Sequence, residues 1–101
     1  MIVVRDVFQV EPEQMKLAKE LVKQEREIGK RLGHHVTRVL TDLTGEYYTL
    51  IMESEYTSLA DYEVALKKVL ADPEFQRSYP QFRKLIRGGR REIFTVEALI
   101  R

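Results

Sequence analysis

A long amphipathic segment, residues 12–32, does most to limit the folds open to this chain. At about 100° per residue its apolar side chains fall on one side of a helix and most of its charged side chains on the other. Pro12 suits the first turn of such a helix, and Gly33 suits its end. The apolar side consists of Met15, Ala18, Leu21, Val22, Ile28, Gly29 and Leu32. The pattern predicts one long helix with a single buried face.

Glu25 lies near the centre of this apolar side, although its chemistry belongs with the charged set. An ionised carboxylate in a core costs several kcal/mol unless it is paired or hydrated. We therefore expect the Glu25 side chain to point toward the interior and to contact an arginine, a tyrosine hydroxyl or water, or to face a polar cavity. A helix that is rotated or ends early would instead leave Glu25 in solvent.

The rest of the chain alternates between strand-like and helix-like patterns. Residues rich in Val, Ile, Thr, Phe and Tyr predict strands at 2–10, 35–43, 47–56 and 90–99. Ser58 and Asp72 are suited to cap two further helices, and Gly88-Gly89 is expected to end the second of these. The order β-α-β-β-α-α-β is that of a ferredoxin-like α+β fold, a four-stranded antiparallel sheet with helices on one face. The whole chain, 1–101, is expected to form a single domain.

The sheet face that the helices leave uncovered is not clearly polar. The face toward the helices is predicted to carry Val4, Phe8, Leu50, Met52, Phe94, Val96 and Ala98. The open face is predicted to mix Val3, Val7, Val39, Ile51 and Ile93 with Arg5, Thr37, Glu53, Thr95 and Glu97. A face that is half apolar and half paired charges is more typical of a buried dimer interface than of a hydrated sheet. The pattern therefore favours a homodimer.

Composition excludes several classes of function. The chain has 17 Lys and Arg against 16 Asp and Glu, a net charge of +1, which does not suit a nucleic-acid-binding protein. It has no cysteine, which removes disulfides, thiolate catalysis and Cys-based zinc sites. No apolar run approaches the ~18 residues of a membrane span, and the first residues do not have the pattern of a signal peptide. We therefore expect a cytoplasmic protein without nucleic-acid or membrane partners.

Three segments resemble a known family: RDVFQVEP at residues 5–12, SLADY at residues 58–62 and ADPEF at residues 71–75. They are similar to segments of the NIPSNAP-like proteins, in the superfamily of dimeric α/β barrels, and the resemblance covers nearly the whole chain. It implies that two sheets pack face to face in a dimer. Val7 replaces the tyrosine usual in the family, and Glu13 replaces a frequent glycine, so a ligand site that uses this tyrosine would be altered here.

Several proteins of this superfamily are oxygenases or bind haem in a pocket between sheet and helices. In this chain Glu25, Phe75, Tyr79 and Phe82 would line such a pocket, with His35 as a further polar candidate. The competing interpretation is that the aromatic residues are ordinary core and that Glu25 is paired. Neither helix expected after residue 56 contains histidine, and His34 and His35 point to opposite faces of an extended segment. We therefore expect neither haem, another cofactor nor a metal ion.

Three hypotheses of function follow. The first is a homodimer that binds a small molecule between sheet and helices. The second is a cofactor-independent monooxygenase that uses the same pocket. The third is a structural or interaction module without a ligand. The sequence does not specify the ligand, and the family resemblance implies no established reaction.

Overall fold

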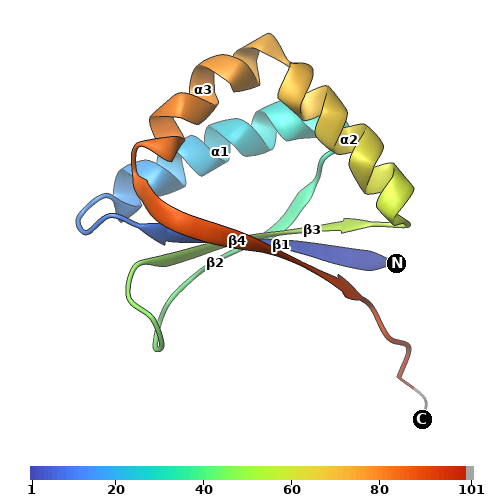
Figure 1. Ribbon diagram of the computed structural model, residues 1–101, viewed down its shortest axis with the longest axis horizontal. Coiled ribbons are helices and arrows are strands. Elements are labelled where there is room, and N and C mark those ends of the chain that lie inside the picture. Colours follow the sequence, from blue (N-terminus) through green and yellow to red (C-terminus); the bar gives the residue numbers. More distant parts are fainter. Residues whose placement is uncertain (100–101) are drawn as a thin grey trace.

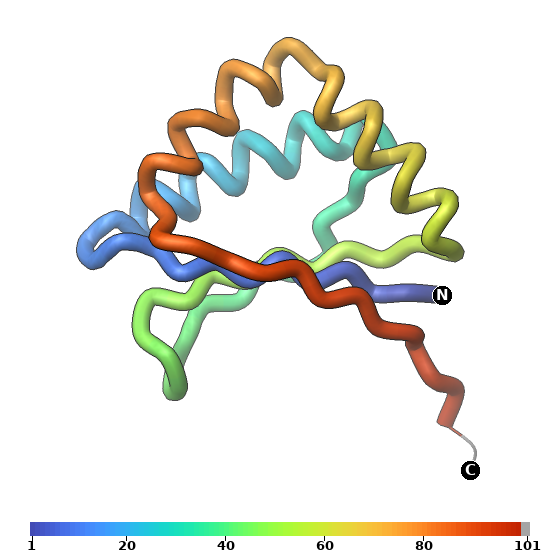
Figure 2. The backbone as a smooth tube through the Cα atoms, viewed as in Figure 1, coloured from blue at the N-terminus to red at the C-terminus, as the bar shows by residue number. Residues whose placement is uncertain are grey.

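The computed structural model describes residues 1–99 and contains the predicted order of strands and helices (Figure 1). The elements are β1 (Ile2–Val10), α1 (Met15–Arg31), β2 (Val36–Thr41), β3 (Thr49–Tyr56), α2 (Leu59–Ala71), α3 (Pro73–Arg83) and β4 (Ile86–Thr95). The strands form one antiparallel sheet in the order β2-β3-β1-β4. All three helices lie on one face of this sheet, and the other face is uncovered (Figure 2). The predicted ferredoxin-like α+β arrangement is confirmed.

Local capping signals set three of the helix ends in residues 1–99. The Ser58 hydroxyl accepts a hydrogen bond from the Asp61 backbone N–H at 3.2 Å, and the Asp72 carboxylate accepts one from Phe75 N–H at 3.0 Å. The helix α1 starts at Met15, later than predicted, because Glu13 adopts a left-handed conformation with φ 71° that a helix cannot continue. Gly33, with φ 80°, follows the end of α1 as expected.

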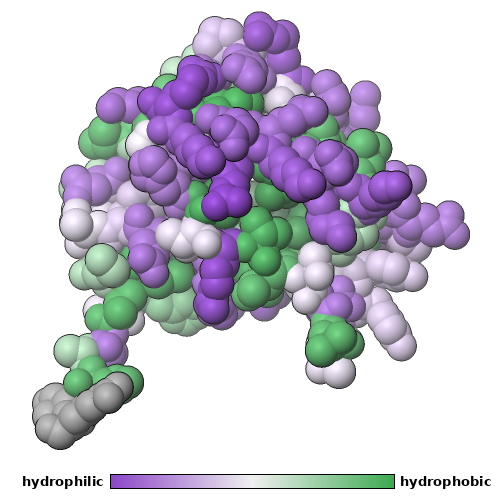
Figure 3. Space-filling view, turned by 180° about the vertical axis from the view of Figure 1, so that it is seen from behind, coloured by the Kyte–Doolittle hydropathy of each residue, from purple (hydrophilic) through white to green (hydrophobic). Residues whose placement is uncertain are grey.

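Two apolar clusters hold the helices to the sheet. The larger cluster packs α1 and α3 on the sheet, and its buried members are Val10, Ala18, Leu21, Val22, Leu50 and Phe82. The smaller cluster lies beneath α2 and contains Val4, Tyr56, Tyr62 and Ala65. Seen from behind, hydrophilic side chains cover the helical layer, and hydrophobic surface shows below them (Figure 3). The predicted buried side of α1 is confirmed by these contacts.

The start of β4 differs from the prediction. The helix α3 ends at Arg83, where Leu85 N–H donates to the Phe82 carbonyl at 2.9 Å, and β4 already begins at Ile86. Gly88-Gly89 therefore lies inside a strand and does not end a helix. A Cβ atom on Gly89 would lie 2.6 Å from the Val7 carbonyl oxygen. This glycine permits close approach of two backbones within the sheet.

The faces assigned to β2 and β4 were wrong in part. Ile93 pairs with Val4 and so faces the helices, whereas Phe94 pairs with Val3 on the open face. A register shift between Val36 and Arg38 likewise puts Val39 opposite Met52 on the helix-facing side. It also puts Leu40 opposite Ile51 on the open face. The open face still combines apolar residues with the predicted charges of Arg5 and Glu53.

Candidate functional site

A cavity of about 230 Å³ lies between the sheet and the three helices. Its apolar lining consists of Phe8, Val36, Met52, Leu66, Val69, Leu70, Phe75 and Phe82. Its polar lining consists of Asp6, Glu25, His34, Tyr62, Tyr79 and Arg91. Four of the residues selected from the sequence, Glu25, Phe75, Tyr79 and Phe82, are thus brought together around one space.

Glu25 is the most unusual group in the cavity. Its Oε1 atom is buried and has no hydrogen-bond partner among residues 1–99. Burial raises the pKa of Glu25 from 4.5 to about 7, and no neighbouring cation lowers it. The expected orientation toward the interior is confirmed, but the structure provides no protein partner for Oε1. Near neutral pH this carboxyl is present in both its neutral and its ionised form.

Aromatic rings form one side of the cavity. The spacing of Phe75 and Tyr79 on α3 stacks their rings with centroids 5.4 Å apart and planes inclined by 25°. The rings of Phe8 and Phe82 meet edge to face at 5.0 Å. Phe82 is fully buried and also belongs to the larger apolar cluster, whereas Tyr79 is 36% exposed. The aromatic stripe therefore serves both as core and as cavity wall.

The histidine that lines the cavity is His34, and the predicted His35 does not line it. The backbone N–H of His34 donates to the Gly29 carbonyl at 2.9 Å. A hydrogen bond joins the Nδ1 atom of the His34 ring to the Tyr56 hydroxyl. A Cβ atom on Gly29 would lie 2.5 Å from the His34 carbonyl oxygen, so only glycine permits this approach. Burial lowers the pKa of His34, which favours its neutral form.

An ion pair at the cavity was not predicted from the sequence. Asp6 and Arg91 are opposite each other on β1 and β4, with Arg91 Nε 2.6 Å from Asp6 Oδ1. The Arg91 guanidinium also lies 5.7 Å from the centre of the Tyr62 ring. Burial alone would lower the pKa of Arg91, but the hydrogen bond and the negative charge of Asp6, with smaller contributions from Tyr62, together outweigh burial and raise this pKa. The pair was missed because the predicted face of β4 was wrong by one residue.

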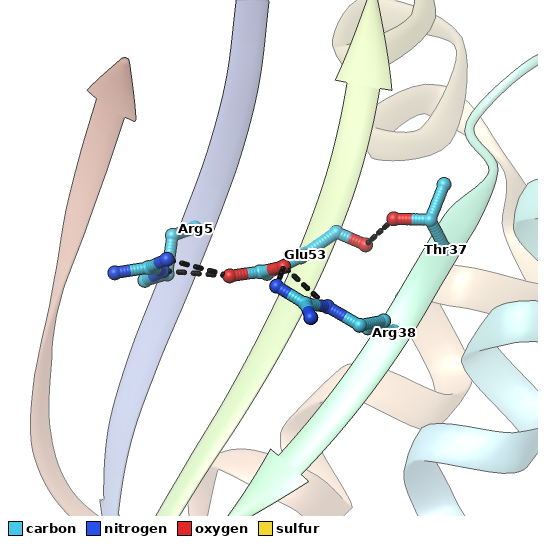
Figure 4. Close-up of polar contacts among 4 residues, drawn as sticks. All are labelled: Arg5, Thr37, Arg38 and Glu53. Atoms are coloured by element: carbon cyan, nitrogen blue, oxygen red, sulfur yellow. Dashed lines mark hydrogen bonds and ion pairs between the residues drawn. The ribbon is translucent and has the colours of Figure 1, made fainter. Parts of the chain in front are cut away.

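A second polar cluster lies on the open face of the sheet (Figure 4). The Glu53 carboxylate accepts hydrogen bonds from Arg5 Nε at 2.8 Å and from Arg38 Nε and Nη2 at 2.8 and 2.6 Å. The Thr37 hydroxyl donates to the Glu53 carbonyl at 3.2 Å. Burial by itself raises the pKa of Glu53, but the two arginines outweigh it and hold this pKa below its ordinary value. Glu53 is only 4% exposed although no helix covers it.

Residues 1–99 contain no group of three or more His, Cys, Asp or Glu side chains placed to hold a metal ion. Within the same range, no helix combines the length and the apolar character that crossing a membrane requires.

Comparison with known proteins places the chain in a family. A family model described as NIPSNAP matches residues 5–98. The chain belongs to the NIPSNAP family. This confirms the resemblance seen in its three sequence segments. Among curated proteins, none matches the sequence significantly.

Solved structures of NIPSNAP proteins share this fold. An uncharacterized NIPSNAP domain protein from Burkholderia xenovorans superimposes with a TM-score of 0.91 at 13% identity, over 100% of this chain and 99% of that one. A NIPSNAP family protein from Agrobacterium tumefaciens superimposes with a TM-score of 0.88 at 21% identity, over 95% of this chain and 85% of that one. A putative antibiotic biosynthesis monooxygenase from Nitrosomonas europaea superimposes with a TM-score of 0.74 at 11% identity, over 95% of this chain and 98% of that one. At such identities the similarity establishes a common fold.

Proposed function

We propose that this NIPSNAP protein binds a small, largely apolar molecule in the cavity between the sheet and the helices. The buried, unpartnered Oε1 of Glu25 carries the proposal, because burying a carboxyl without a partner costs stability. Groups whose pKa is strongly shifted in a concave site are often functional. The volume of about 230 Å³ lies below the ~300–1,000 Å³ of drug-sized ligand sites, so the ligand is small.

Native mass spectrometry of the protein purified from its own host tests this proposal. Val69 lines the cavity and is 7% exposed, whereas Val64 lies on the outside of the same helix α2 and is 54% exposed. The wild type and the Val64→Trp control are expected to retain a small molecule. Val69→Trp is expected to lose it, because the indole fills the space. A wild type without any retained mass, or equal retention by Val69→Trp, contradicts the proposal.

We also propose that the protein is a homodimer formed through the open sheet face. Uncovered apolar residues (Val3, Leu40, Ile51 and Phe94) beside a nearly buried Glu53 suit an interface better than a hydrated surface. Stable interfaces commonly bury about 1,600 Å² in total. Ile51→Lys is expected to give monomers or aggregates in analytical ultracentrifugation. The control Leu17→Lys, at an exposed position on α1, is expected to stay dimeric. A wild type that is monomeric at micromolar concentration refutes the dimer.

A second candidate function is cofactor-independent oxygenation in the same cavity. One observation favours it: a carboxyl with a pKa of about 7 is suited to remove or return a proton near neutral pH. The similar Nitrosomonas europaea structure is described as a putative antibiotic biosynthesis monooxygenase. Oxygen uptake with ionisable phenolic substrates tests this activity, and Glu25→Gln should abolish it. Absence of both uptake and a retained ligand favours the third hypothesis, an interaction module.

The cytoplasm is the location we propose for this protein. The absence of cysteine among its 101 residues is in keeping with a reducing compartment. Fractionation of the host, with detection of the native protein, tests the location.

A further inference from the structure

We infer that the ligand of this cavity is a small amine whose ammonium group pairs with the carboxylate of Glu25. Its apolar body would lie against the rings of Phe75, Tyr79 and Phe82. The inference rests on the proposed function, because it names the chemical class of the molecule bound in the same cavity.

The charges around the cavity leave Glu25 without a counter-charge. Asp6 and Arg91 neutralise each other across 2.6 Å. His34 is hydrogen-bonded to Tyr56, and its lowered pKa favours the neutral form. Among the described lining residues, an ionised Glu25 thus adds a negative charge that no protein cation balances. A bound cation supplies what the protein lacks, whereas a bound anion would add repulsion.

The aromatic wall favours the same class of ligand. The faces of aromatic rings carry partial negative charge and attract an ammonium group within about 6 Å of the ring centre. The stacked pair Phe75–Tyr79 and the edge-to-face pair Phe8–Phe82 bring four rings to this cavity. The lining residues Leu70 on α2 and Tyr79 on α3 are 53% and 36% exposed, so part of the cavity lining is in contact with solvent. An amine with an apolar body fits both the carboxyl and the rings.

Three probes with one carbon skeleton separate charge from shape: phenethylamine, 2-phenylethanol and phenylacetate. Their affinities for the wild-type protein are measured by calorimetric titration at pH 8, where most Glu25 is ionised. Phenethylamine is expected to bind at least tenfold more tightly than the alcohol, and phenylacetate is expected to bind most weakly. Glu25→Gln should weaken binding of the amine at least tenfold and leave the affinity for the alcohol nearly unchanged. Retained binding of the alcohol also shows that this variant is folded.

Binding of the amine should also depend on pH in a defined direction. The ionised fraction of Glu25 rises from about one tenth at pH 6 to about nine tenths at pH 8, so the affinity should rise about tenfold. The other titratable or charged groups facing the cavity are Asp6, His34, Tyr62, Tyr79 and Arg91. Glu25→Gln should remove this dependence, and any slope that persists in the variant belongs to one of these groups.

The matched control is Glu20→Gln, at an exposed position on the same helix, which should bind the amine as the wild type does. Tighter binding of the alcohol or of phenylacetate overturns the amine inference and leaves the proposed function intact. Undiminished amine binding by Glu25→Gln overturns it as well. Failure of all three probes also overturns it, while the proposed function is judged separately from the mass retained by the wild type and lost in Val69→Trp.

Discussion

Replacement of Glu25 by glutamine is expected to stabilise the protein above neutral pH. The pKa of this carboxyl is 4.5 at its ordinary value and about 7 in the fold. At about 1.4 kcal/mol per pKa unit, this difference corresponds to about 3 kcal/mol. Because burial is its cause, the difference is a cost of keeping an ionised carboxyl in the cavity. A glutamine of similar shape carries no such charge.

The sign follows from where the proton is held. Below about pH 4.5 the carboxyl is protonated in both states and the cost is absent. Between pH 4.5 and about 7 the unfolded chain releases the proton and the folded protein keeps it, so the free energy of unfolding falls as pH rises. Above about pH 7 the whole cost is present. The advantage of Glu25→Gln should therefore be under about 1 kcal/mol at pH 5 and about 1–3 kcal/mol at pH 8, since the amide is itself left without a partner.

Urea unfolding followed by circular dichroism at pH 5 and pH 8 measures this difference. Protein concentration must be the same in every experiment, because the stability of the proposed homodimer would depend on it. The control Glu20→Gln, exposed on α1, should change the free energy of unfolding by no more than about 0.5 kcal/mol at either pH. A Glu25→Gln variant less stable than the wild type at pH 8 refutes the reasoning, because it means that the folded protein gives this carboxylate a stabilising partner.

Three further substitutions test other parts of the structure by urea unfolding. Glu53→Ala should cost about 1–3 kcal/mol because it leaves two arginines without their acceptor, whereas Glu55→Ala, exposed on the same strand, should cost no more than about 0.5 kcal/mol. Gly89→Ala should cost about 1–3 kcal/mol through its clash with a backbone oxygen, but Gly88→Ala, which meets open space, should be neutral or slightly stabilising. Glu13→Gly should stabilise by up to about 1 kcal/mol by relieving a left-handed φ of 71°. Equal effects within either pair, or a less stable Glu13→Gly, contradict these assignments.

Much of the fold was predictable because its signals are local. A serine or aspartate at the start of a helix caps it by accepting a hydrogen bond from the backbone N–H three residues later, whatever the rest of the fold. Ser58 and Asp72 cap α2 and α3 in this way. The 3.6-residue period likewise located Glu25 on the buried side of α1 and brought Phe75, Tyr79 and Phe82 to the same cavity. These predictions needed no knowledge of which strand pairs with which.

What the sequence did not reveal depends on contacts between distant segments. The face of β4 is fixed by its pairing with β1, and a strand predicted to start four residues late carried no information on that register. Because of the same error, the Asp6–Arg91 pair was not predicted. His34 faces the cavity because Gly29 lets the chain turn close to α1, and the sequence shows only two adjacent histidines. Long-range register and close backbone approach thus account for the site residues that were missed.

Stability and binding should respond to Glu25 in opposite directions, as is common where a site sacrifices stability for function. The burial cost of about 3 kcal/mol falls on the free protein, and an ammonium ligand that pairs with the carboxylate offsets this cost. A ligand at a hundred times its Kd stabilises a protein by about 2.7 kcal/mol, which is close to that cost. Phenethylamine at that concentration should therefore raise the free energy of unfolding of the wild type at pH 8 by about 2.7 kcal/mol, to about that of free Glu25→Gln or above it. The same concentration should add at most about 1.4 kcal/mol to the variant, because the variant binds the amine at least tenfold more weakly. Equal stabilisation of both proteins would show that the amine does not act through this carboxylate.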